Sequence, residues 1–91
     1  MTREQEERMD KLASVFANGV MRAAADMLHR RKVGSASLDY GRMCELMRKH
    51  AVRGMNEMLD DGKNAPGLVS HHMAVYAASA ASKAVNEYFA N

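Results

Sequence analysis

Hydrophobic residues recur every three or four positions along most of the sequence, a period typical of amphipathic helices. In the first segment one apolar stripe consists of Met9, Leu12, Phe16, Val20, Ala23 and Met27. This stripe is widened to about half of the helix circumference by Ala13, Ala17, Ala24 and Leu28. Thr2 and Gln5 fit a capping box at the start, and the cations at 29–32, followed by Gly34, fit a C-terminus. The pattern predicts a long helix over residues 3–32.

A second helix is predicted over residues 38–60, after a turn at residues 34–37, with Ser37 or Asp39 as the N-cap. Its apolar positions are Tyr40, Met43, Met47, Ala51, Met55 and Met58, with Cys44, Val52 and Leu59 flanking them. Gly54 lies inside this face, although a glycine in a helix interior costs about 1 kcal/mol relative to alanine. We expect the close approach of a neighbouring helix to compensate.

A third helix is predicted over residues 66–90, and it is apolar on nearly all sides. A helix of this kind is surrounded by protein, and we do not expect two neighbours in a chain of 91 residues to enclose it. We therefore expect a homo-oligomer, most simply a homodimer with the third helix at its centre. The expected self-association surface consists of Met73, Tyr76, Ala77, Ala80, Ala81, Ala84 and Tyr88.

Composition supports an all-α fold, a three-helix bundle with a long first helix. Ile is absent and Thr occurs once, whereas strands favour β-branched and aromatic residues. A single Cys excludes a disulfide scaffold. Since typical domains run to roughly 100–200 residues, we expect one helical domain over residues 1–91.

Nothing in the sequence indicates export or a membrane. No stretch approaches the roughly 18 apolar residues of a membrane span, and the acidic, polar start does not resemble a secretory signal. A lone Cys suits a reducing compartment. We expect a cytoplasmic protein without membrane contact.

Basic charge is concentrated in the middle third of the chain, although the net charge is only +2. Residues 22–53 hold eight Lys or Arg against three acidic residues. On the second helix Leu46 lies on the otherwise polar face, within a short basic ridge. Such a ridge can meet an acidic protein surface, neutralise phosphates, or form a solvated, partly paired face with no partner. The candidate partner-binding residues are Arg42, Leu46, Lys49, Arg53, Arg30 and Arg31.

No catalytic residue, metal or cofactor is expected. Adjacent helical residues point about 100° apart, so His71 and His72 cannot chelate as two His at i,i+4 do. Cys44 would need a nearby His to act as a nucleophile, and His50 points about 120° away on the same helix. The methionines of the second helix indicate either core packing or an adaptable recognition groove.

These features favour a small non-enzymatic helical protein that acts by binding another macromolecule, as a regulator, adaptor or inhibitor of a protein complex. The alternative is a nucleic-acid-associated protein that uses the basic ridge of the second helix and the end of the first. Trp is absent and both Phe residues lie on apolar faces, so no platform for stacking bases is evident. An enzyme is the third class, and it would require a polar cluster that only different helices together could form.

Overall fold

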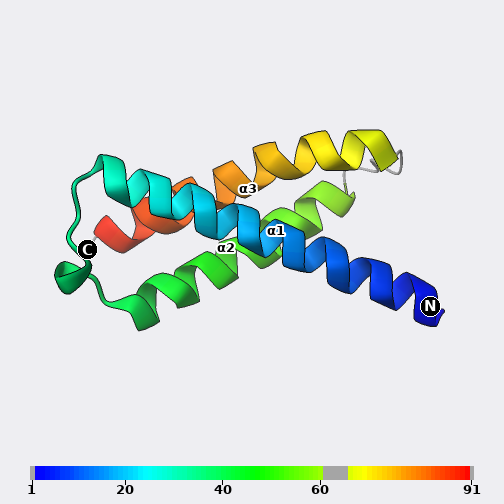
Figure 1. Cartoon of the computed structure of the whole chain (residues 1–91), viewed down its shortest axis with the longest axis horizontal. Helices are drawn as coiled ribbons and strands as arrows, with labels where there is room; N and C mark the ends of the chain where they lie inside the picture. The colour runs from blue at the N-terminus through cyan, green and yellow to red at the C-terminus, as the bar shows by residue number, and fades with distance from the viewer. Residues whose placement is uncertain (1, 61–65, 91) are drawn as a thin grey trace.

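Three α-helices account for most of the chain, as the hydrophobic pattern predicts. The computed structural model describes residues 2–60 and 66–90, apart from the side chains of Ser35 and of residues 66–71. The helices are α1 (Arg3–Arg30), α2 (Tyr40–Asp60) and α3 (Pro66–Phe89), with a short 3-10 helix, η1 (Ser35–Ser37), before α2 (Figure 1). The described residues form no strand. The all-α prediction is confirmed, and each predicted helix boundary lies within two residues of the observed one.

α1 begins with the predicted capping box. The Gln5 N–H donates to Thr2 Oγ1 at 3.3 Å, and the Thr2 N–H donates to Gln5 Oε1 at 2.9 Å. Its 28 residues make a rod of about 42 Å, close to the longest dimension of the molecule, 44 Å. Residues 2–8 are all exposed. In Figure 1 the first turns of α1 extend away from α2 and α3.

α1 ends two residues earlier than predicted, in a Schellman motif that is centred on lysine rather than on Gly34. Lys32 adopts a left-handed conformation with φ 56°. The Lys32 N–H donates to the His29 carbonyl at 3.0 Å, and the Val33 N–H donates to the Leu28 carbonyl at 3.1 Å. These bonds satisfy carbonyls at the helix end. Lysine pays a steric cost in this conformation that glycine avoids.

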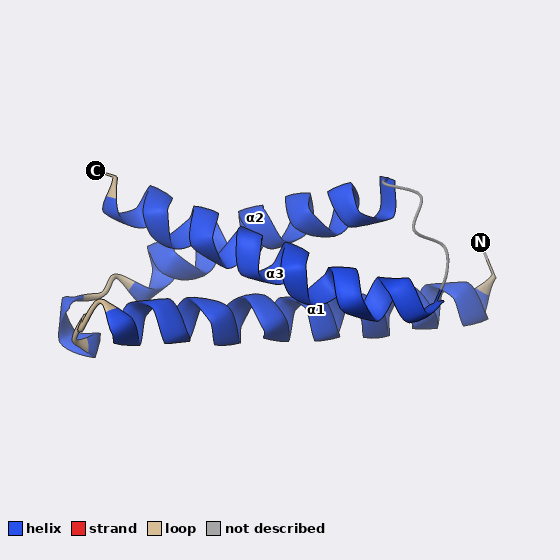
Figure 2. Ribbon diagram, turned by 90° about the horizontal axis from the view of Figure 1, so that it is seen from above, coloured by secondary structure: helices blue, strands red, loops and turns tan. Residues whose placement is uncertain are grey.

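α3 occupies the centre of the fold. It packs along both α1 and α2, whereas α1 and α2 touch each other much less. In Figure 2, α3 crosses α2 and runs from beside α1 at the right to the upper left, where the chain ends. The core therefore consists of two interfaces that share one helix.

The structure corrects the expected self-association surface. Met73, Ala77, Ala80, Ala81 and Ala84 are buried within a single chain, with at most 8% of any of them exposed. Of the other residues assigned to that surface, Tyr76 and Tyr88 are half-buried. α1 and α2 enclose this face of α3 without a second copy, because alanine side chains allow both helices to approach closely.

Two glycines mark the points of closest approach. A methyl group added at Gly19 of α1 would lie 3.2 Å from the Cβ of Ala77, and one added at Gly54 of α2 would lie 3.1 Å from Phe16 Cζ and 3.5 Å from Ala80 Cβ. Gly54 is therefore the position where all three helices meet. The expectation that a neighbouring helix explains this mid-helix glycine is confirmed.

α2 turns a different face toward the core than its hydrophobic pattern predicts. Its buried residues are Met43, Leu46, His50, Gly54 and Met58. The placement of Leu46 on an exposed patch is wrong, because only 6% of it is exposed and it belongs to the core. The predicted apolar positions Met47 and Met55 are only half-buried, and Tyr40 is exposed.

None of the helices in the described part of the chain is long and apolar enough to cross a bilayer.

The end of α1 gives a first prediction. Lys32→Gly should raise the free energy of unfolding by about 1 kcal/mol, because glycine removes the penalty of a left-handed conformation. Chemical denaturation measures this difference. The control is Lys32→Ala, which removes the same charge but keeps Cβ and should bring no gain. Equal stability of the two variants would contradict the conclusion that the left-handed conformation of residue 32 is costly for a side chain with Cβ.

The meeting point of the three helices gives a second prediction. Gly54→Val should lower the free energy of unfolding by about 1–3 kcal/mol through overpacking, although helix propensity alone favours valine over glycine. Thermal and denaturant unfolding measure the change. At Gly41 an added methyl group lies 3.5 Å from Asp39 Oδ1 and meets nothing closer, so Gly41→Ala should not destabilise. A stabilised Gly54→Val variant would show that the helices do not meet closely here.

Candidate functional site

A polar cluster on α2 and α3 sets the orientation of α2. Lys49 Nζ donates to Glu87 Oε1 at 2.8 Å, and His50 Nε2 lies 2.5 Å from Glu87 Oε2. His50 is buried, while Glu87 is half-exposed. The hydrogen bond from Lys49, followed by that from His50, lowers the pKa of Glu87 from 4.5 to about 2. The carboxylate is thus tied to two consecutive residues of α2, which holds this face of α2 against α3.

A second set of contacts joins the three helices near the end of α3. The Tyr88 hydroxyl accepts a hydrogen bond from the Asp39 N–H, just before α2, at 2.8 Å. Arg31, at the end of α1, donates to Asn86 Oδ1 at 3.0 Å. The same guanidinium lies 5.1 Å from the centre of the Phe89 ring. Polar contacts therefore hold both α1 and α2 against the C-terminal end of α3.

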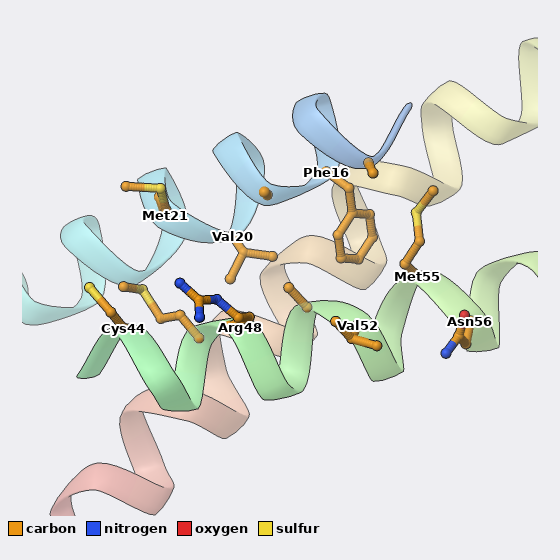
Figure 3. A pocket seen from close by; sticks show the side chains of 12 residues that line it. Phe16, Val20, Met21, Cys44, Arg48, Val52, Met55 and Asn56 are labelled. Atoms are coloured by element: carbon orange, nitrogen blue, oxygen red, sulfur yellow. The ribbon is translucent and has the colours of Figure 1, made fainter. Parts of the chain in front are cut away.

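With α2 held in this way, an apolar groove of about 420 Å³ opens between α1 and α2 (Figure 3). None of the described side chains of α3 lines it. Its walls are formed by Ala13, Phe16, Ala17, Val20 and Met21 of α1 and by Cys44, Met47, Arg48, Ala51, Val52, Met55 and Asn56 of α2.

The groove has a buried floor and an exposed apolar rim. Phe16 and Val20 are each 1% exposed, whereas Met21 and Val52 are 55% and 56% exposed. The half-buried Met47 and Met55 also line it. The most apolar face of α2 thus looks partly into the groove rather than onto α3. Exposed apolar surface gathered in one place is typical of interaction sites.

Among the residues that the structure describes, Arg48 is the one charged residue of the groove lining. It is exposed and forms no ion pair with any residue that the structure describes. In Figure 3 its side chain extends from α2 toward α1. The groove therefore combines an apolar surface with a single unpaired positive charge.

The predicted partner-binding residues do not form one free basic surface. Arg30 pairs with Asp26 at 3.1 Å, Lys49 pairs with Glu87, and Arg31 is held by Asn86. Leu46 is buried, as described above. Of the six residues, Arg42 and Arg53 are exposed and have neither an ion pair nor a side-chain hydrogen bond among the described residues.

The methionines of the second helix pointed to a possible recognition groove, but its position between the first and second helices was not predicted, although a signal for it was present. The apolar arcs of both the first and the second helix cover about half of the circumference, which is wider than one neighbouring helix covers. Val52 and Cys44 lie at the edge of the second arc. When two helices with wide apolar arcs both pack on the same central helix, that helix covers only part of each arc. The uncovered parts of the two arcs then face each other.

The described residues contain no cluster of three or more His, Cys, Asp or Glu side chains placed to hold a metal ion. The side chain of His71 lies outside the described part. Cys44 lines the groove, whereas His50 bonds to Glu87 on α3, so the two residues belong to different faces of α2.

The chain matches no known protein family, and no curated protein or solved structure is detectably similar to it. The interpretation of the groove therefore rests on its geometry and chemistry.

The lowered pKa of Glu87 gives a third prediction. A carboxylate whose pKa is lower in the folded state stabilises the fold above its unfolded pKa, and this contribution disappears as the pH falls through the folded pKa. The stability difference between the natural chain and Glu87→Gln should therefore shrink between about pH 4.5 and pH 2. Urea unfolding at several pH values measures it.

The matched control for this prediction is Glu57→Gln. Glu57 is exposed on α2 and has no ion pair with a described residue. A stability difference for Glu87→Gln that stays constant down to pH 2 would contradict the account of the cluster.

Proposed function

We propose that this protein is a non-enzymatic binding module whose groove between α1 and α2 receives an amphipathic helix of another protein. It would act as a regulator, adaptor or inhibitor by binding that helix. The observation that carries the proposal is the apolar lining, which no segment of the described chain covers. Apolar helix faces held in grooves are a recurrent mode of peptide recognition, and methionines adapt such surfaces to their ligand.

The arrangement of the helices supports this occupant. In four-helix bundles the core lies between helices that pack side by side around a common axis. Here α3 packs on α1 and on α2, which themselves make little contact. A fourth helix seated in the groove would contact both α1 and α2. It would complete a bundle of which this chain supplies three members.

The extent of the groove sets the length of the helix it fits. The lining runs over residues 13–21 of α1 and 44–56 of α2. At 1.5 Å per residue these stretches measure about 12 and 18 Å. A partner segment of about three helical turns, with apolar residues spaced three and four apart, matches these dimensions.

A second copy of the chain is the runner-up occupant, and it would make the predicted homodimer. The first turns of α1 are free to reach another chain, but residues 3–8 contain no apolar side chain to fill the groove. A homodimer that uses the groove could instead place two grooves against each other. We keep the cytoplasmic location as part of the proposal, because an exposed free thiol at Cys44 suits a reducing compartment.

The test uses the methionine methyl groups as reporters. Met21, Met47 and Met55 line the groove, while Met43, Met58 and Met73 are buried elsewhere in the core. Methyl NMR spectra of the full chain are recorded during titration with a panel of three-turn helical peptides that carry leucines on one face. Saturable shifts concentrated on the three groove methionines support the proposal.

Two results would overturn it. If no peptide shifts the groove methionines, the groove is not a helix site. If these signals change with protein concentration in the absence of peptide, a second copy is the occupant. Binding of duplex DNA that weakens with salt and is lost in the double variant Arg42→Glu/Arg53→Glu, without any peptide effect, would favour the nucleic-acid alternative.

A pair of valines gives the fourth prediction. Val52 and Val75 are 56% and 57% exposed, but only Val52 lines the groove. Val52→Asp should weaken peptide binding at least tenfold, because a carboxylate must be desolvated there. Val75→Asp on α3 should leave the affinity unchanged. Isothermal titration calorimetry measures both, and equal affinities of the two variants would contradict the assignment of the site.

A further inference from the structure

We infer that the helix received by the groove carries a carboxylate beside its apolar face and that Arg48 binds it. This inference rests on the proposed function and adds the chemistry that selects the partner. The surface involved is the apolar lining described above, together with the one cation within it.

Arg48 stands in the middle of the α2 wall. It lies one helical turn from Cys44 on one side and from Val52 on the other, so the three residues share one face. Residues of α1 contribute only apolar side chains to the opposite wall. Any helix that covers Val52 and Cys44 together therefore also covers at least the stem of Arg48.

Burial of the Arg48 charge under a bound helix would make the groove selective for an acidic helix. A guanidinium that loses water without gaining a partner opposes binding, because an unpaired charge is costly to bury. The described residues of the groove lining include no Asp or Glu, and Arg48 has no ion pair with any of the residues that the structure describes. The missing carboxylate must come from the bound helix. Arginine suits this role because its planar fork binds a carboxylate through two parallel hydrogen bonds.

The same charge argues against a second copy as the occupant. In a two-fold dimer formed groove to groove, each lining presents Arg48 and no acidic residue. The described lining of such an interface would offer the two guanidinium groups no counter-charge. The charge pattern of the groove is complementary to a different, acidic sequence.

The experiment compares two peptides with the same leucine stripe over three helical turns. One peptide carries Glu at the positions that flank the stripe, and the other carries Lys there, so the comparison does not depend on the register of binding. Affinities for the full chain are measured by calorimetry, and the methionine methyl signals report whether the groove is occupied. The Glu peptide should bind about tenfold or more tightly than the Lys peptide.

Two variants separate Arg48 from general surface charge. Arg48→Glu should reverse the preference, so that the Lys peptide binds more tightly. Arg42→Glu makes the same change of charge on α2 at an exposed position outside the groove lining, and it should keep the preference for Glu. The preference of the natural chain should also fall at high salt, as screening increases.

The possible failures are distinguishable. If both peptides shift the groove methionines with equal affinity, the groove is a helix site and the assigned role of Arg48 is wrong. A preference that Arg42→Glu abolishes as fully as Arg48→Glu also overturns the inference, because net charge then explains it. If neither peptide shifts the groove methionines, the proposed function itself fails.

Discussion

The close approach of α1 and α2 to the alanines of α3 is the constraint on which the rest of the structure depends. Ala77 meets Gly19 of α1, and Ala80 lies beside Gly54 of α2, where the ring of Phe16 also packs. Larger side chains at these positions would separate the helices. Small side chains bury little apolar area each, so stability here relies on close contact along the whole of α3 rather than on a few large residues.

This packing has a consequence for the other two helices. Because α1 and α2 both use α3 as their main neighbour, neither covers the other. The contacts of Glu87 with Lys49 and His50 fix α2 so that Leu46 faces the core while Met47 and Met55 are only partly covered. The apolar groove follows from this orientation. A rotation of α2 that buried its most apolar face against α3 would close the groove and break the bonds to Glu87.

Much of the fold could be predicted from the sequence because it depends on local signals. The capping box of Thr2 and Gln5, the turn before Asp39 and the helical period all act over a few residues. The orientation of α2 could not be predicted, because it depends on a contact between residues 37 positions apart, His50 and Glu87. Helical wheels rank faces by hydrophobicity, and they give His50 no weight as a packing residue. The same limitation led to the wrong environment for Leu46 and for the alanines of α3, since a wheel does not show how closely two neighbours can approach an alanine-rich helix.

The candidate site was therefore predictable only in part. The methionines of α2 were recognised as a possible recognition surface, but the basic ridge was favoured as the partner site, and several of its cations are engaged within the chain. The groove can act as proposed only if a single chain leaves the space between α1 and α2 open for a helix of another protein. Cys44, the one cysteine of the sequence, lines that groove, so its alkylation rate tests the claim most directly. We predict a fast rate that does not depend on protein concentration and that falls in step with the binding of an acidic amphipathic helix. A slow rate in the free chain, or a rate that such a helix leaves unchanged, would contradict it.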